Sequence, residues 1–205
     1  MLRLALTLVI GYLLGSISPG VLLSRALGHE DIRTKGSGNS GTTNMLRVMG
    51  KKMAALTFMG DMLKGIVAVL IGAALVGNKG GELVGAVGAV LGHNFPVFFG
   101  FKGGKGIATS FGCLLFIYPL QALAAFAVFL ALVLITRYVS LGSIGAAVTM
   151  PIFVMLTTPK DPVVWGCALF LGLLAIWRHR ANVARLLAGT ESKINFKSSQ
   201  KKERS

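Results

Sequence analysis

Residues 107–136 read IATSFGCLLFIYPLQALAAFAVFLALVLIT, a run without a charged side chain. As a single α-helix this run would be about 45 Å long, whereas the hydrocarbon core of a bilayer is about 30 Å thick. Its middle contains Pro119, which lacks a backbone N–H and disfavours helix at the residue before it. The run is therefore either one kinked, tilted helix or two short helices joined at Pro119.

The composition of the whole chain is that of a membrane protein. Hydrophobic residues make up 54% of its 205 residues and charged residues 14%, against about 25% charged in soluble domains. Further apolar stretches long enough to cross a bilayer lie at residues 2–23, 53–76, 83–99, 140–157 and 163–177. The first of them is like a signal peptide, but it is long and lacks a clean small-residue cleavage site. We therefore interpret it as a retained span.

The distribution of positive charge decides between one helix and two in the 30-residue run. The chain has 21 Lys and Arg residues against 7 Asp and Glu, a net charge of +14. Most basic residues lie in three clusters, between residues 25 and 52, at Lys102 and Lys105, and from Arg178 onward. Basic loops stay on the cytoplasmic side, but with six spans the first and third clusters would lie on opposite faces. A split at Pro119 gives seven spans, places all three clusters in the cytoplasm and leaves the N-terminus outside.

The sequence thus predicts an all-α, polytopic membrane helix bundle with about seven transmembrane helices. We expect a single membrane-embedded domain over residues 1–190 and a basic, mobile cytoplasmic tail over residues 191–205. Cys113 and Cys167 both lie in apolar stretches, so no disulfide framework is implied. Nucleic acid is a poor candidate partner, because the basic residues are not interleaved with solvent-facing aromatic residues. We expect neither a cofactor nor a metal.

The first basic segment, residues 31–47, has the composition of a phosphate-binding loop. It reads DIRTKGSGNSGTTNMLR, with three glycines among basic, hydroxyl and amide residues. Glycine permits positive φ, so successive backbone N–H groups can converge on an anion. Thr42, Thr43 or Asn44 could cap a following helix, whose N-terminus attracts negative charge, and Arg47 would lie one turn further along. The alternative is a flexible polar linker.

The second basic segment, residues 92–106, reads GHNFPVFFGFKGGKG. Lys105 lies between glycines, which suggests a second phosphate site. The segment is not a Walker A loop, because Phe99 stands where the first glycine belongs and Gly106 replaces the Ser or Thr that would hold magnesium. Nucleotide hydrolysis is therefore not predicted.

The third basic segment, residues 177–185, reads WRHRANVAR and follows the last apolar stretch. His179 and Asn182 are three residues apart and would share a helix face, where they could hydrogen-bond a glycerol hydroxyl or a phosphate. For the arginines of this segment, the alternative is an anchor at the membrane interface.

Other polar residues lie within or beside apolar stretches. Asp61 and Lys64 are costly inside a membrane, so we expect them to pair, to face the bundle interior or to contact substrate. Ser140 and Ser143 either lie near the site or cap a helix.

These segments, in this order, resemble the bacterial acyl-phosphate-dependent glycerol-3-phosphate acyltransferases. The resemblance rests on residues 15–17, 31–47, 61–65, 92–106, 137–140 and 178–182. Two residues depart from the usual pattern: Thr42 stands where alanine is usual, and Pro19 is displaced from its common place directly after Ile17.

The resemblance implies an enzyme of phospholipid synthesis in the bacterial cytoplasmic (inner) membrane. Such enzymes move a fatty acyl group from acyl-phosphate to the 1-hydroxyl of sn-glycerol-3-phosphate, giving lysophosphatidic acid and phosphate. The expected partners are these two substrates and membrane lipid, and a contact with the upstream acyl-phosphate-forming enzyme is left open. The active site is expected on the cytoplasmic side.

The residues and the resemblance together give a candidate site. We expect the acyl-phosphate head group to contact Ser37, Gly38, Asn39, Gly41 and Thr43. We expect glycerol-3-phosphate to be held by Arg47, Lys105, His179 and Asn182. Further candidates for substrate binding are Asn44, Gly103, Gly104 and Ser143, with Asp61 and Lys64 in support.

Two points stay open in this interpretation: which group accepts the hydroxyl proton, and whether the protein is an enzyme or a transporter. His93 or His179 could act as the base, or the leaving phosphate could itself accept the hydroxyl proton. The mixed anhydride already carries a good leaving group, so positioning and charge stabilisation could supply most of the rate. The alternative class is a small organophosphate anion transporter, which fits less well because the basic loops lie on one side and no inverted repeat is visible.

Overall fold

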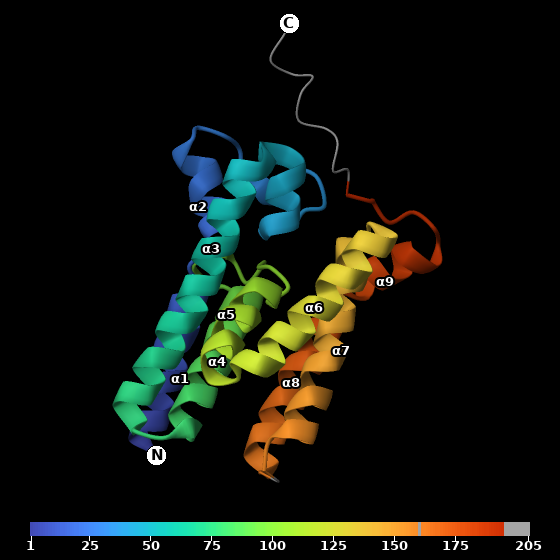
Figure 1. Cartoon of the computed structure of the whole chain (residues 1–205). Coiled ribbons are helices and arrows are strands. Elements are labelled where there is room, and N and C mark those ends of the chain that lie inside the picture. The colour runs from blue at the N-terminus through green and yellow to red at the C-terminus, as the bar shows by residue number, and fades with distance from the viewer. Residues whose placement is uncertain (160, 195–205) are drawn as a thin grey trace, which may run out of the picture.

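The computed structural model describes residues 1–159 and 161–194, and over these residues it consists of helices and loops without a strand (Figure 1). Its α-helices are α1 (Leu2–Ser16), α2 (Pro19–Ala26), α3 (Thr42–Val76), α4 (Lys79–Asn94), α5 (Ile107–Ile117), α6 (Pro119–Thr136), α7 (Val139–Thr157), α8 (Pro162–Arg178) and α9 (Arg180–Leu187). Two 3-10 turns, η1 (Ile32–Thr34) and η2 (Val97–Phe99), lie in the loops. The predicted all-α fold is confirmed.

Residues 107–136 form two helices, α5 and α6, which meet at Tyr118. This residue has φ −141° and ψ 70°, outside the helical region, and Pro119 is the first residue of α6. Proline favours the first position of a helix because its φ is already helical, while it drives the preceding residue out of the helical region. The split at Pro119 is confirmed, and the single kinked helix is wrong.

The number of candidate spans is close to the seven expected, but α5 is too short to cross a bilayer by itself. By length and apolarity, five segments of the described chain can cross, and α8 with α9, bent by 53°, makes a sixth. α5 has 11 residues and is therefore about 16 Å long. Because α6 returns the chain toward the end from which α5 starts, α2 and α9 lie at the same end of the bundle, away from the N-terminus (Figure 1).

Two helices of the first half are interrupted near this end. The predicted span over residues 2–23 is broken: α1 ends at Ser16, Ser18 has an extended backbone, and Pro19 begins α2. Gly50, with φ 83°, bends α3 between its first turns and its long apolar part. α2 and the start of α3 thereby lie together at the end of the bundle (Figure 1).

Glycines allow α4 to pack closely against α1. A Cβ on Gly15 of α1 would overlap the backbone of Ala89, and a Cβ on Gly92 of α4 would overlap the backbone of Tyr12. In a membrane, small residues bring helix backbones close enough for strong van der Waals packing. At this contact the glycines therefore serve helix packing.

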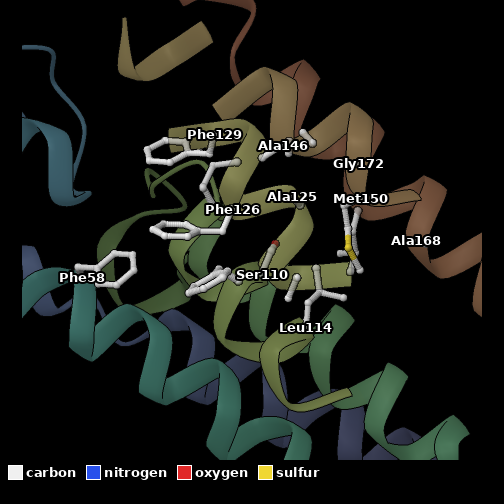
Figure 2. Close-up of a pocket in the computed structure, with 16 residues that line it drawn as sticks. Phe58, Ser110, Leu114, Ala125, Phe126, Phe129, Ala146, Met150, Ala168 and Gly172 are labelled. Carbon is white, nitrogen blue, oxygen red and sulfur yellow. The ribbon is translucent and has the colours of Figure 1, made fainter. Parts of the chain in front are cut away.

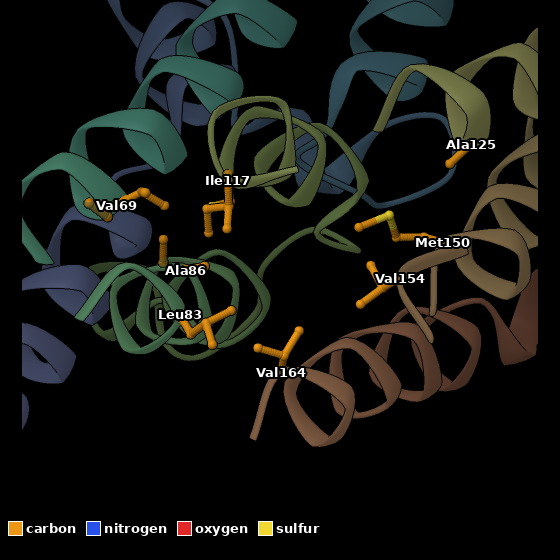
Figure 3. Packing of buried hydrophobic residues seen from close by; sticks show 11 residues of the cluster. Val69, Leu83, Ala86, Ile117, Ala125, Met150, Val154 and Val164 are labelled. Carbon is orange, nitrogen blue, oxygen red and sulfur yellow. The ribbon is translucent and has the colours of Figure 1, made fainter. Parts of the chain in front are cut away.

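A buried apolar core joins two groups of helices. It connects α3, α4 and α5 to α6, α7 and α8 (Figure 3), and its members include Val69, Leu83, Ile117, Met150 and Val164. In the first group α4 packs on α3 and also on α1, and in the second group α7 packs on α6 and α8. A cavity lies between the two groups where the three basic segments meet.

Candidate active site

A polar cavity of about 300 Å³ lies between the two helix groups. All three basic segments contribute to its wall, so the structure brings together residues that are more than 140 positions apart in the sequence. The predicted site residues that line it are Ser37, Asn39, Gly41, Thr43, Asn44, Arg47, Asp61, His93, Lys105, Ser143, His179 and Asn182. Four others do not line it: Gly38 lies on an exposed turn, while Gly103, Gly104 and Lys64 lie behind the wall.

Asn44 organises the first basic segment from within. Its side chain is 1% exposed, and its Nδ2 donates to the carbonyls of Ile32, Lys35 and Asn39 at 2.8–3.0 Å. Its Oδ1 accepts from the backbone N–H of Ser37 at 2.8 Å. These bonds give the side chain a structural role, and its predicted contact with substrate stays a prediction.

The helix expected to follow the first basic segment begins at Thr42. Its N-cap is Gly41, and no side chain caps it, so the predicted capping by Thr42, Thr43 or Asn44 is wrong. The first N–H groups of α3 are consequently left without a side-chain cap and can be offered to a ligand.

Three helices start at the cavity. The first residues of α3, of α5 and of α7 are among its lining residues. The first turn of a helix offers free backbone N–H groups and a partial positive charge, which together favour an anion. Combined with Arg47 and Lys105, these helix starts make the cavity a site for negatively charged groups.

Glu191 is the residue of the cavity that the sequence analysis missed. Its Oε1 accepts from Ser140 Oγ and Asn182 Nδ2, both at 2.8 Å, and its Oε2 accepts from Arg185 Nε at 2.6 Å. The residue is 8% exposed. The available signal was the rarity of carboxylates, because Glu191 is one of only 7 acidic residues in a strongly basic chain.

The start of the predicted tail contacts the helix bundle at two residues. Glu191 is buried, and the N–H of Ile194 donates to the carbonyl of Arg137 at 2.8 Å, while Ser192 and Lys193 are exposed. The mobile tail over residues 191–205 stays a prediction, and residues 195–205 lie outside the described part of the chain. Ser140 lies in the site through its bond to Glu191, and α7 has no side-chain cap.

The surroundings of Lys105 and Glu191 shift the pKa of each side chain. Burial lowers the pKa of Lys105 to about 8; Glu191 opposes this shift, and the nearby Arg185, Arg47 and Arg178 add to it. Burial raises the pKa of Glu191, but the hydrogen bonds from Asn182, Ser140 and Arg185 outweigh burial and lower the pKa overall. Glu191 is therefore ionised at neutral pH, and Lys105 loses its proton as the pH rises through about 8.

His179 lies at the bend between α8 and α9, three residues before Asn182. Its Nδ1 is 2.7 Å from the carbonyl oxygen of Ala175. A carbonyl can only accept, so in the neutral ring the proton is on Nδ1 and the lone pair is on Nε2. His179 and Asn182 both line the cavity, and the contact with substrate expected for them stays a prediction.

Asp61, Lys64 and His93 form a buried cluster. Lys64 Nζ is 2.7 Å from Asp61 Oδ1, and His93 Nδ1 is 3.1 Å from the same oxygen and 3.0 Å from Lys64 Nζ. Lys64 also donates to the carbonyl of Ile17 at 2.7 Å, in the break between α1 and α2. The expectation that Asp61 and Lys64 pair inside the bundle is confirmed, and Lys64 satisfies a backbone oxygen that the broken helix leaves free.

An apolar pocket of about 110 Å³ adjoins the polar cavity (Figure 2). It lies among α5, α6, α7 and α8, with Phe58 from α3 at its edge. Small residues such as Ala125, Ala146 and Gly172 make room in it, and Phe126 and Phe129 lie along one side. Phe58, Ile107 and Phe129 line both spaces, so the two lie side by side.

Fold and site together define a class: a polytopic helical membrane protein with a cationic cavity beside an apolar pocket. Residues 5–189 match the family described as "Glycerol-3-phosphate acyltransferase". The chain belongs to the glycerol-3-phosphate acyltransferase family, as the sequence motifs indicated. This is a family of enzymes of phospholipid synthesis, so the transporter alternative is not supported.

Individual relatives agree with this assignment. The chain is 48% identical to the glycerol-3-phosphate acyltransferase of Thermoanaerobacter pseudethanolicus, over 94% of this chain and 96% of the relative. It is 47% identical to that of Clostridioides difficile, over 95% of each chain.

Solved structures agree as well. The chain is similar to a crystal structure of PlsY (YgiH), described as an integral membrane glycerol 3-phosphate acyltransferase in its glycerol 3-phosphate form. The TM-score is 0.87 at 40% identity, covering 94% of this chain and 96% of that one. For the lysophosphatidic acid form of the same protein, the TM-score is 0.85 at 39% identity, covering 94% and 95%.

Proposed function

We propose that this acyltransferase uses acyl-phosphate as its donor and the sn-1 hydroxyl of glycerol-3-phosphate as its acceptor. The observation that carries the proposal is the cationic cavity, which is built from all three basic segments and lies beside an apolar pocket. Both proposed substrates bear a phosphate, and the donor also has a lipid tail. The glycerol 3-phosphate and lysophosphatidic acid forms of the similar crystal structures support this pairing of substrate and product.

The two substrates would occupy different walls of the cavity. Ser37, Asn39, Gly41 and Thr43 lie by the start of α3 and would bind the acyl-phosphate head group, with the acyl chain in the apolar pocket. Arg47, Lys105, His179 and Asn182 would hold glycerol-3-phosphate, with Ser143 beside them. A phosphate between a helix start and these cations gains charge-assisted hydrogen bonds.

The proposed reaction needs no protein base. The acceptor hydroxyl oxygen attacks the acyl carbon, the bond from that carbon to the phosphate oxygen breaks, and the hydroxyl proton passes to the leaving phosphate. His93 is poorly placed as a base, because its Nδ1 is held by Asp61 and Lys64 and its Nε2 edge packs against Gly104. Within the described residues, Nε2 of His179 has no hydrogen-bond partner, and in the neutral ring it can accept from a substrate hydroxyl.

We place the enzyme in the bacterial cytoplasmic (inner) membrane, with the cavity on the cytoplasmic side and the N-terminus outside. The support is that all three basic segments meet at one end of the bundle, as the positive-inside rule requires of cytoplasmic loops. A contact with the enzyme that forms acyl-phosphate stays a prediction.

The test is product formation by the purified protein in detergent, where no gradient exists. With labelled acyl-phosphate and glycerol-3-phosphate, we expect lysophosphatidic acid and one phosphate per turnover. Arg47→Ala and Lys105→Ala should reduce kcat/KM for glycerol-3-phosphate strongly, and acyl-CoA or acyl-carrier protein should not replace the donor. Turnover with acyl-CoA but not with acyl-phosphate would overturn the donor assignment.

A further inference from the structure

Two arginines from distant segments hold the loop that carries Lys105. This loop covers residues 95–106, between α4 and α5. Arg33 Nη1 donates to the carbonyls of Phe99 at 2.6 Å and Lys102 at 3.0 Å. Arg178 donates to the carbonyls of Gly103 and Gly104 at 2.7–3.0 Å. Four backbone carbonyls of one short loop are thus bound by guanidinium groups.

The first of these arginines is itself held in place. Arg33 forms a two-pronged contact with Asp31, with Nε to Oδ1 at 2.9 Å and Nη2 to Oδ2 at 2.7 Å. It also lies 5.7 Å from the centre of the Phe99 ring. Such paired hydrogen bonds fix the plane of the guanidinium as well as its position.

Arg178 is held by aromatic rings instead of a carboxylate. Its guanidinium lies 5.2 Å from the Phe95 ring centre and 5.9 Å from that of Trp177, a geometry that favours the cation. Neither Arg33 nor Arg178 lines the cavity. Apart from the bonds of Arg33 to Asp31, their hydrogen bonds go to carbonyls of the loop, so their direct contacts position the loop.

The contact of Arg178 fixes the peptide plane directly before Lys105. The carbonyl of Gly104 and the N–H of Lys105 belong to one planar trans peptide and point in opposite directions. Holding this carbonyl therefore sets the direction of the Lys105 N–H and the place of its Cα. The N–H of Gly104 is bound in turn by the carbonyl of His93 at 3.0 Å.

The other face of the loop packs on His93 without room for side chains. A Cβ on Gly103 would overlap the His93 carbonyl, and a Cβ on Gly104 would overlap the His93 ring. The loop is thus held from the first basic segment, from the end of α8 and from α4. Lys105 leaves it toward the cavity, where it reaches Asn182.

We propose that Arg33 and Arg178 are positioning residues of acyl transfer: together they clamp the loop over residues 95–106 so that Lys105 and the start of α5 face the substrate phosphate. This inference rests on the proposed function. Arg178 thereby has a role beyond the interface anchor that the sequence analysis left as an alternative for this segment.

The chain offers a matched control for each arginine. Arg180 stacks on Trp177 at 4.4 Å, like Arg178, and Arg25 lies over Phe99 at 5.8 Å and binds Asp31 at 3.0 Å, like Arg33. Within the described residues, neither control donates to a carbonyl of the loop. Each control substitution therefore removes one positive charge beside the same aromatic ring and leaves the bonds to the loop carbonyls in place.

The kinetic test compares Arg33→Ala with Arg25→Ala and Arg178→Ala with Arg180→Ala. We expect the two clamp variants to raise the KM for glycerol-3-phosphate about tenfold or more, with thermal midpoints near that of wild type. The two controls should stay within about twofold of wild type. A KM equal to that of the matched control, or a loss of kcat with a lowered midpoint and an unchanged KM, would overturn the clamp and leave a structural arginine.

Amide hydrogen exchange gives a second readout without substrate. Exchange over residues 99–105 should be faster in Arg33→Ala and Arg178→Ala than in the two controls, and equal exchange contradicts the clamp. If an alanine variant does not fold, Arg178→Lys and Arg33→Lys take its place, because lysine keeps the charge but cannot make the fork. If wild type makes no lysophosphatidic acid, the proposed function fails, while hydrogen exchange still decides whether the arginines hold the loop.

Discussion

Lys105 and Asn182 are joined by a hydrogen bond of 2.5 Å from Nζ to Oδ1, although 77 positions separate them in the sequence. The amide of Asn182 is turned by Glu191, which accepts from its Nδ2 and leaves Oδ1 for the lysine. One carboxylate outside the predicted site therefore sets the orientation in which the second and third basic segments meet.

The first prediction concerns pH. Because burial lowers the pKa of Lys105 to about 8, its charge is complete well below pH 8 and is lost as the pH rises through this value. We expect kcat/KM for glycerol-3-phosphate to fall above an apparent pKa of about 8. A Lys105→Arg variant would keep its positive charge over this range, so its residual activity should not show this fall. A flat wild-type profile from pH 7 to about 9.5 would contradict the assignment.

The second prediction concerns Glu191. In Glu191→Ala, the donors on Ser140, Asn182 and Arg185 lose their acceptor, at a cost of about 1–3 kcal/mol for each group left buried. We expect a lower thermal midpoint and a higher KM for glycerol-3-phosphate, with Glu191→Gln intermediate. The exposed Glu30, whose ion pair with Lys35 is 3.4 Å long, provides the control Glu30→Gln. Equal midpoints for the Glu191 and Glu30 variants would refute this role.

The third prediction concerns the buried ion pair. Lys64→Met leaves Asp61 without its partner and the Ile17 carbonyl without its donor, which should cost about 3–5 kcal/mol. Adding Asp61→Asn should restore part of the stability, measured as the unfolding midpoint in detergent. Lys79→Met, which breaks the exposed pair with Glu82, should cost about 0–1 kcal/mol. Equal stability of Lys64→Met and Lys79→Met would contradict a stabilising role of the buried ion pair.

The fourth prediction concerns Thr42, where the resemblance described above led us to expect alanine. Its Oγ1 is buried and has no hydrogen-bond partner in the described part of the chain. We expect Thr42→Ala to be as stable as wild type or more stable, by about 1 kcal/mol, because an unpaired hydroxyl leaves the interior. Its KM values should not change, whereas Thr43→Ala should raise the KM for acyl-phosphate. A raised KM in Thr42→Ala would instead assign this hydroxyl to substrate binding.

The fifth prediction concerns the proton acceptor. If the leaving phosphate takes the hydroxyl proton, His93→Ala and His179→Ala each keep measurable turnover when folded. His179→Ala should mainly raise the KM for glycerol-3-phosphate, because it removes a binding side chain. Complete loss of kcat in either variant, with an unchanged thermal midpoint, would indicate a histidine base.

Much of the site was predictable because the residue types that bind phosphate lie close together within single segments of the sequence. Glycines beside Lys105 and Arg47, and the pair His179 and Asn182, are recognisable one segment at a time. Asn44 was also found, but its role was not, because its four backbone partners are fixed only by the folded turn. Glu191 was missed because nothing in its own segment shows that Ser140 and Asn182 lie beside it.

The sequence alone determined the apolar helices, the break at Pro119 and the common end of the three basic segments. These follow from properties that act over a few residues or add along the chain: proline sterics, the free energy of transfer into lipid, and the placement of positive loops. Only the tertiary structure decided how long α5 is and that Glu191 lines the cavity. It also decided that Lys64 bonds to the carbonyl of Ile17 and that Arg33 and Arg178 bind the loop that carries Lys105. Each of these depends on which groups become neighbours when helices pack, and a buried polar group bonds to whatever packing brings within reach, however distant it is in sequence.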